Sequence, residues 1–245
     1  MTFELDYLTE LEFEKPIMVA GLPGIANVGK LAIEFLINEL ETEKFAELYS
    51  DYFPGWVVRD NGLVEGLRVD FYKGELDGFD QDFILVTADA QASSSLGQYK
   101  LSRRIVEIAT EHEVDKVFTL AAFLAPGEDR APVIGAATDS ETAELIVGEE
   151  VELLDGGKIV GMNGLLLSLA HDKGINGACL LGTTSGGTVD GNASRNVLSE
   201  LARILEFELD LSDFEDRVPE LPKFKPPKMK TPSIPSGDED VSYIR

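Results

Sequence analysis

The chain has 245 residues, and its 45 Asp and Glu against 21 Lys and Arg give a formal net charge of −24. A body this acidic repels nucleic-acid phosphates and anionic lipid, which disfavours binding to nucleic acid or to a membrane surface. A hydrophobic share of 44% is ordinary for a globular protein and disfavours global disorder. Because Cys179 is the single cysteine, no internal disulfide is possible, which is typical of an intracellular protein.

The N-terminal segment does not have the pattern of a secretory signal. Its first 15 residues contain five acidic side chains and no basic n-region. Elsewhere the apolar runs are interrupted by glycines and polar residues, well below the ~20 residues that a membrane helix requires. We therefore expect a soluble, cytoplasmic protein that does not associate with membranes.

The charge divides the chain into two parts. Residues 1–217 carry 41 acidic and 16 basic side chains, a net charge of −25, whereas residues 218–245 carry 4 acidic and 5 basic ones. The second part also holds six of the eleven prolines. These compositions predict one folded domain over 1–217 and an extended, mobile Pro/Lys-rich tail over 218–245. The acidic excess of the body further suggests a strongly hydrated, halophile-like surface, as in proteins of a salt-rich cytoplasm.

Along the first 217 residues, apolar periodicity predicts strands that alternate with helices. Such alternation indicates an α/β domain with a mixed or largely parallel sheet. Asn61-Gly62 predicts a hairpin-type turn. The expected strands are 17–20, 45–58, 67–72, 82–87, 117–122, 132–138 and 177–182, and the expected helices are 26–40, 96–113, 140–145, 163–172 and 193–209.

The first predicted strand–helix turn carries the spacing of a phosphate-binding loop. Gly24, Gly29 and Lys30 match the pattern G-x-x-x-x-G-K, but Leu31 stands where that loop requires a Ser or Thr hydroxyl for Mg²⁺. One interpretation is a tight turn whose glycines allow close helix–sheet packing. The alternative is an anion site at the helix N-terminus, with Gly24, Asn27, Gly29 and Lys30 as its residues.

The sequence contains only weak signals for other metal-binding, catalytic or ligand-binding sites. His112, His171 and Cys179 are too few for a His/Cys metal cluster, so no metal and no cofactor are expected. We expect His112 to be solvated near a helix end, and the serines at 93–95 to cap a helix rather than act as nucleophiles. The loop from Gly182 to Thr188 follows a predicted strand, where α/β sheets bind ligands; it is either a small-molecule pocket or a surface loop.

Several glycine-rich pieces together resemble the proteasome assembly chaperone 2 family, in particular its archaeal members. The pieces occur in one order and span about residues 15–207. They are PIMVAGLPGIANVGKLAIEFLINEL, the Ser-rich turn before Gln98-Tyr99, Ala125-Pro126-Gly127 with the following PVIGAAT, GMNGLLL, and GINGACLL.

This resemblance implies a three-layer α/β/α fold similar to nucleoside phosphorylases and hydrolases but without their catalytic groups. It also implies a non-catalytic chaperone that forms a homo-oligomer and binds proteasome α subunits or particles. Family tails of this kind end in a hydrophobic residue, Tyr and any residue, and dock between α subunits. Here Tyr243 is third from the end, followed by Ile244 and Arg245, so the tail either docks in a shifted register or serves only as a solvated terminus.

Two functions follow as expectations. The first is the assembly chaperone implied by the resemblance, with Tyr243, Ile244 and Arg245 as its partner-binding residues. The alternative is a nucleotide- or small-anion-binding protein, or an enzyme, that uses the turn from Gly24 to Lys30 together with the loop from Gly182 to Thr188.

Overall fold

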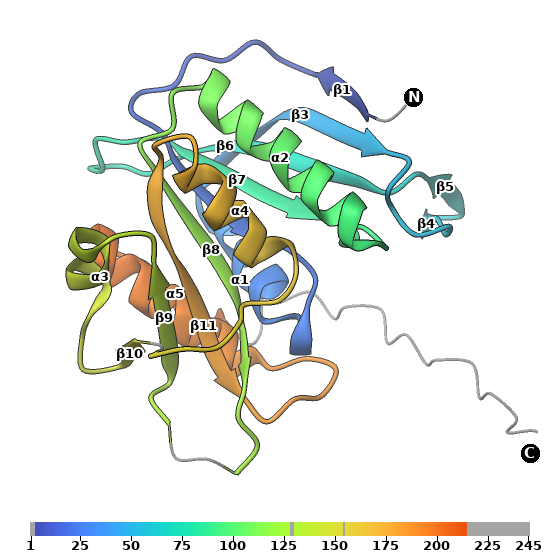
Figure 1. Ribbon diagram of the computed structural model, residues 1–245. Coiled ribbons are helices and arrows are strands. Elements are labelled where there is room, and N and C mark those ends of the chain that lie inside the picture. The colour runs from blue at the N-terminus through green and yellow to red at the C-terminus, as the bar shows by residue number, and fades with distance from the viewer. Residues whose placement is uncertain (1–2, 128–129, 154, 215–245) are drawn as a thin grey trace, which may run out of the picture.

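A nine-stranded mixed sheet runs through the middle of the molecule (Figure 1). The structure is a computed structural model, described here over residues 3–127, 130–153 and 155–214. Across the sheet the strands follow the order β1 (Phe3–Tyr7), β3 (Glu41–Ser50), β6 (Arg68–Glu75), β7 (Phe83–Ala88), β2 (Ile17–Gly21), β8 (Lys116–Leu124), β11 (Asn176–Thr184), β9 (Val133–Ala137) and β10 (Val151–Leu153).

Parallel pairing occupies the centre of this sheet. Strands β7, β2, β8 and β11 are parallel to one another, and β9 and β10 are parallel to each other at one edge. Antiparallel pairing joins β1, β3, β6 and β7 at the other edge, and it also joins β9 to β11. The expected α/β fold with a mixed sheet is confirmed.

Helices cover both faces of the sheet and complete three layers. Helices α2 (Ser95–Glu111) and α4 (Met162–His171) lie in front of the sheet in Figure 1, and their apolar residues belong to one buried core cluster. Helices α1 (Val28–Glu39), α3 (Ser140–Ile146) and α5 (Gly191–Leu205) pack into a second cluster on the opposite face. None of the described helices is long and apolar enough to cross a membrane.

The central strand shows why the sequence specifies this arrangement. All five residues of β2 are buried, because β2 has a strand on each side and a helical layer on each face. A continuous apolar run, rather than an alternating one, is what such a position requires. Helix α5 instead buries only one side, as its predicted periodicity requires: Val197, Leu201 and Ile204 are buried. Ser94 caps α2 as expected, since its hydroxyl accepts from the Gly97 amide at 3.1 Å.

Two strands and two element boundaries differ from the prediction. Strands β1 and β10 were not expected, and β3 covers Glu41–Ser50 rather than 45–58. Helix α5 ends at Leu205 instead of residue 209, because Glu206 adopts a left-handed conformation with φ 57°. The chain then turns back over the sheet, so that Phe207 packs against Phe83 with a ring separation of 5.6 Å.

A second, two-stranded sheet stands apart from the main one. Strands β4 (Val58–Asp60) and β5 (Leu63–Glu65) pair antiparallel around the predicted turn. Asn61 and Gly62 have φ values of 47° and 86°, the left-handed conformations that an Asn-Gly hairpin turn uses. This β4–β5 hairpin lies at the right-hand edge of the molecule in Figure 1, beside the N-terminus of α2.

The expectation of a solvated His112 is wrong. Its ring is half-buried in an aromatic cluster, with ring centroids 4.8 Å from Phe13 and 5.4 Å from Phe45. The Nε2 atom is buried without a hydrogen-bond partner. Burial lowers the pKa of His112 below its ordinary value, against a smaller opposite effect of the Glu111 carboxylate.

This burial predicts a pH dependence of stability. The folded protein favours neutral His112, whereas the unfolded chain protonates it near pH 6.5, so stability is lost as the pH falls below about 6.5. We expect His112→Phe to lose less stability than the wild type between pH 7.5 and pH 5.5 in denaturant melts. His171→Gln is the matched control, because His171 is exposed. Equal pH dependence of wild type and His112→Phe would contradict this role.

Candidate functional site

The switch point of the sheet lies between β2 and β8. The chain leaves β2 through α1 toward β3, whereas it leaves β8 toward β9 on the other side. In open α/β sheets, ligands bind at the carboxyl ends of the strands at such a point. The predicted turn over residues 24–30 follows β2 at this edge, and the predicted loop over residues 182–188 begins within β11, which extends to Thr184.

The structure brings this turn and this loop together. The Asn27 side-chain amide donates to the Thr188 carbonyl at 3.0 Å, and the Asp190 amide donates to the Ala26 carbonyl at 3.0 Å. Ala26 and Asn27 both have left-handed backbones, with φ 48° and 51°, which turn the chain sharply into α1. The two segments therefore form one surface at the carboxyl edge.

Gly29 allows α1 to contact the sheet backbone. A Cβ atom at this position would lie 2.0 Å from the Leu120 carbonyl oxygen of β8. A Cβ at Gly21 would lie 2.1 Å from the Gly29 carbonyl oxygen. Two glycines therefore face each other where β2, α1 and β8 meet, as close helix–sheet packing requires. By contrast, a Cβ at Gly24 would have no neighbour closer than 3.9 Å.

Lys30 is bound by groups of the protein itself. Its ammonium donates to the Ala88 carbonyl at 3.0 Å and pairs with the Glu34 carboxylate at 2.8 Å. The side chain is only 15% exposed. Helix α1 has no side-chain cap and no acidic residue in its first turn, a combination that leaves its N-terminus electropositive. Anion binding at Gly24, Asn27, Gly29 and Lys30 stays a prediction.

Two amide side chains that the sequence analysis did not single out join the elements of this edge. Gln91 donates to the Pro23 carbonyl at 2.7 Å and accepts from the Met162 amide at 2.8 Å, which ties the first turn to α4. Asn163 donates to the Leu120 carbonyl at 3.2 Å. The available signal was their position, because Gln91 follows a strand and Asn163 lies between two glycines at a helix start.

Burial alters the chemistry of two titratable side chains, Cys179 and Asp89. Within the described ranges, no three His, Cys, Asp or Glu side chains lie together so as to hold a metal ion. Cys179 is fully buried, and burial raises the pKa of its thiol to about 11, so it is a poor nucleophile. Burial also raises the pKa of Asp89, which accepts from the Arg68 amide at 3.1 Å.

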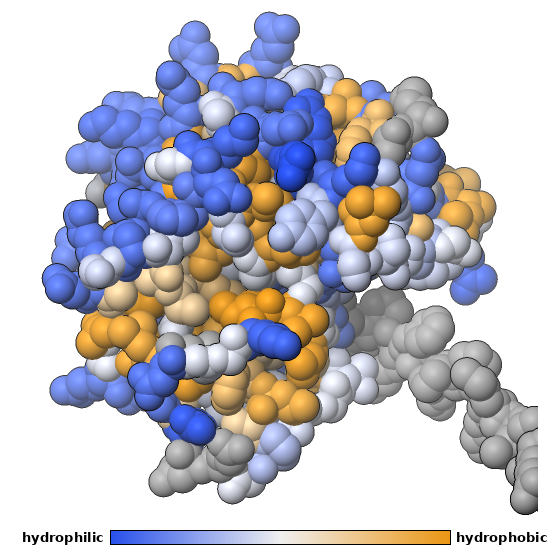
Figure 2. Space-filling model, in the orientation of Figure 1, coloured by the Kyte–Doolittle hydropathy of each residue, from blue (hydrophilic) through white to orange (hydrophobic). Residues whose placement is uncertain are grey.

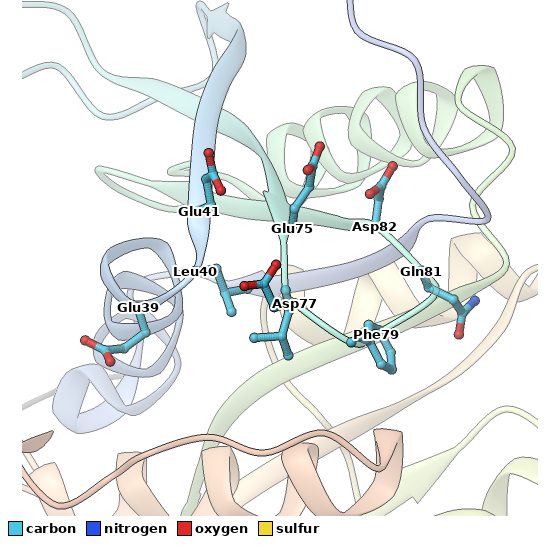
Figure 3. A pocket seen from close by; sticks show the side chains of 10 residues that line it. Glu39, Leu40, Glu41, Glu75, Asp77, Phe79, Gln81 and Asp82 are labelled. Carbon is cyan, nitrogen blue, oxygen red and sulfur yellow. The ribbon is translucent and has the colours of Figure 1, made fainter.

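An acidic groove of about 350 Å³ lies elsewhere, between the end of α1 and the turn from β6 to β7 (Figure 3). The Glu41, Glu75 and Asp82 carboxylates point in the same direction in this view. Lys73 pairs with Glu75 at 2.7 Å and with Asp82 at 3.2 Å. A groove of this charge repels phosphates, so it does not fit the anion that the 24–30 turn suggested. Its floor is apolar, with Leu40, Leu76 and Phe79 among its lining residues.

The predicted partner-binding residues Tyr243, Ile244 and Arg245, like the whole predicted tail over 218–245, lie outside the described residues.

A family model, a curated relative and two solved structures are each similar to most of this chain. The model of the PAC2 family matches residues 18–222. An uncharacterized protein of Methanocaldococcus jannaschii, MJ1210, is 35% identical over 94% of this chain and 93% of its own. The crystal structure of Pyrococcus furiosus PbaB, an archaeal proteasome activator, is similar with a TM-score of 0.81 and 33% identity, over 89% of this chain and 94% of that one. That of Pyrococcus furiosus PbaA, an archaeal homolog of proteasome-assembly chaperone, has a TM-score of 0.72 and 27% identity over 87% and 90%.

Proposed function

Because the chain belongs to the PAC2 family, we propose that it binds proteasome α subunits or particles built from them, as a non-catalytic assembly or activation factor. The observation that carries this proposal is the likeness to the archaeal proteasome activator PbaB, which extends over most of both chains. The resemblance read from the glycine-rich pieces is thus confirmed at the level of the family.

The carboxyl edge supports the non-catalytic part of the proposal. Its polar side chains make bonds within the protein: Lys30 to Ala88 and Glu34, Gln91 to Pro23 and Met162, Asn163 to Leu120. Catalytic groups instead need to reach a bound substrate. These side chains join α1 and α4 to the sheet and to the neighbouring turn, which is a structural role.

The test is direct binding. Full-length tagged protein should retain unassembled proteasome α subunits, or assembled particles, from its own organism at both low and molar salt. An unrelated protein of similar size and charge is the control for nonspecific capture. The proposal is wrong if the protein retains neither unassembled α subunits nor assembled particles, in low salt and in molar salt alike.

Variants of the same experiment locate the binding surface. If the predicted tail carries the contact, deletion of 218–245 and Tyr243→Ala should each weaken retention at least about tenfold, whereas Ser242→Ala should not. Retention that survives both changes would place the contact on the folded domain.

A second candidate is nucleotide or small-anion binding, favoured by the N-terminus of α1, which has neither a side-chain cap nor an acidic residue in its first turn. A rise in melting temperature with millimolar ATP and Mg²⁺ would support it, because a ligand that binds only the folded state stabilises that state.

A further inference from the structure

The sequence contains three Asn-Gly pairs, and the fold places them in three different environments. In such a pair the backbone nitrogen of the glycine can attack the side-chain Cγ atom of the asparagine, because glycine has no Cβ to obstruct the approach. This reaction makes asparagine a thermolabile residue. The local structure around each pair decides whether the two atoms can meet. The pairs are Asn61-Gly62, Asn163-Gly164 and Asn176-Gly177.

The Asn163-Gly164 pair is held in a helix. Asn163 is the second residue of α4 and is only 4% exposed. Its side-chain amide donates to the Leu120 carbonyl at 3.2 Å. A Cβ at Gly164 would lie 2.8 Å from the Ile159 carbonyl oxygen, so the backbone of this glycine is packed against the segment that precedes α4. The helix fixes the backbone torsions that the attack would have to change.

The Asn176-Gly177 pair is held by the main sheet, although Asn176 itself is exposed. The pair begins β11, where the Gly177 amide donates to the Thr138 hydroxyl at 3.0 Å. The Oδ1 atom of Asn176 lies 3.0 Å from Nδ1 of His171. A Cβ at Gly177 would overlap the Val117 carbonyl oxygen of β8, so this backbone has no room to turn. The attacking nitrogen and the attacked amide are both engaged in other contacts.

The Asn61-Gly62 pair lies at the tip of the β4–β5 hairpin, where neither residue is packed. Both residues are exposed, and a Cβ at Gly62 would have no neighbour within 4 Å. Each strand of the hairpin has three residues, and an isolated two-stranded sheet is marginally stable in water. The turn therefore opens locally more readily than a helix or a central strand. In the open turn, the Gly62 nitrogen can reach the Asn61 side chain, and water has free access to both.

We propose that Asn61 is a site of spontaneous, age-dependent conversion to aspartate and isoaspartate, whereas the fold protects Asn163 and Asn176. The Gly62 nitrogen loses its proton and bonds to Cγ of Asn61, and the side-chain nitrogen leaves with that proton as ammonia. Water then opens the resulting succinimide ring at one of its two carbonyl carbons. Attack at Cγ gives aspartate, and attack at the backbone carbonyl carbon gives isoaspartate. The net change replaces the amide NH₂ by OH, which ionises to a carboxylate.

The modification changes the hairpin in two ways. Leu63 and Val64, next to the turn, are 70% and 69% exposed, and Figure 2 shows apolar residues at this edge of the molecule. Either product places a new carboxylate beside them. Isoaspartate also adds a carbon atom to the backbone, so a two-residue turn no longer matches the pairing of β4 with β5. We expect the hairpin to open in molecules that carry isoaspartate.

The first test measures conversion at the three asparagines in one sample. Full-length folded protein is incubated in mildly alkaline buffer, where the glycine nitrogen loses its proton more readily. It is then digested, and mass spectrometry quantifies the separated asparagine, aspartate and isoaspartate peptides. Asn61 should convert at least about tenfold faster than Asn163 and Asn176. In denaturant the three should convert at similar rates, because the protecting structure is gone.

The second test examines the effect on the hairpin. The isoaspartate form, separated from aged wild type by ion exchange, should exchange the amide hydrogens of residues 58–65 at least about tenfold faster than fresh protein. Asn61→Gln keeps an amide but would have to close a larger ring, so the aged variant should match the fresh one. Asn38→Gln is the matched control, because Asn38 is exposed but precedes Glu39 rather than a glycine; this variant should age like the wild type.

Three results would overturn the proposal. The first is a folded protein in which Asn61 converts no faster than Asn163 or Asn176. The second is a denatured protein that shows the same preference for Asn61, since the local sequence rather than the fold would then select the site. The third is an isoaspartate form whose hairpin amides exchange as slowly as those of fresh protein. None of these outcomes depends on proteasome binding.

Discussion

Replacing Gly29 with alanine should destabilise the protein by about 4 kcal/mol or more, a large part of the total stability of an ordinary domain. The new Cβ would lie 2.0 Å from the Leu120 carbonyl oxygen and 2.8 Å from its carbon. Both atoms belong to the backbone of a central strand, so no side-chain rotation relieves the contact. Helix α1 must instead move away from β8 and lose part of the packing of Val28, Ala32 and Phe35.

The matched control lies in the same motif. Gly24→Ala places its Cβ no closer than 3.9 Å to any neighbour, and the left-handed backbone begins only at Ala26, so its effect should stay within about 0.5 kcal/mol. Denaturant melts of the two variants compare the two glycines directly. Similar losses for both would contradict the packing role of Gly29 and favour a turn in which both glycines serve a ligand.

Replacing Lys30 with methionine should cost about 2–3 kcal/mol. The substitution keeps the apolar stem but removes the ammonium that pairs with Glu34 at 2.8 Å and donates to the Ala88 carbonyl. Lys30 and Glu34 are 15% and 21% exposed, and one oxygen of the Glu34 carboxylate is already buried without a partner. The variant would therefore leave a largely buried carboxylate uncompensated.

A double-mutant cycle separates this effect from simple packing. Glu34→Gln added to Lys30→Met should recover more than half of the lost stability, because the second change removes the unpaired charge. Lys116→Met is the control, since its pair with Asp115 is 39% and 51% exposed and should contribute less than about 1 kcal/mol. If Lys30→Met instead leaves stability unchanged but abolishes a thermal shift by ATP with Mg²⁺, Lys30 serves a ligand and the proposed structural role is wrong.

The central elements of the fold were predictable because each satisfies a local pattern. Strand β2 is a continuous apolar run, and α5 has a periodic one; Ser94 caps α2 where the sequence places a serine before an apolar residue. Strand β1 was not predicted. Phe3 and Leu5 alternate with acidic residues as in a strand, but a segment with this many acidic residues is also typical of solvent-exposed chain. Strand β10 has only three residues, too few for a periodicity, and depends on its pairing with β9.

The candidate site was less accessible to prediction, because distant contacts decide the roles of its residues. The spacing of Gly24, Gly29 and Lys30 fits both a packing turn and an anion site. The contact that distinguishes the two glycines involves Leu120, more than ninety positions along the chain. The role of Gln91 likewise depends on Pro23 and Met162, which the fold brings together from distant parts of the chain.

The order of the strands along the chain leaves the central strand without its neighbours early in synthesis. Strand β2 is synthesised early, yet its neighbours β7 and β8 begin only at Phe83 and Lys116. During that interval the nascent chain presents five residues that need burial on both faces, a segment prone to aggregate. The five carboxylates within the first 15 residues precede this strand in the sequence, the place where charged residues flank an apolar strand and oppose its aggregation.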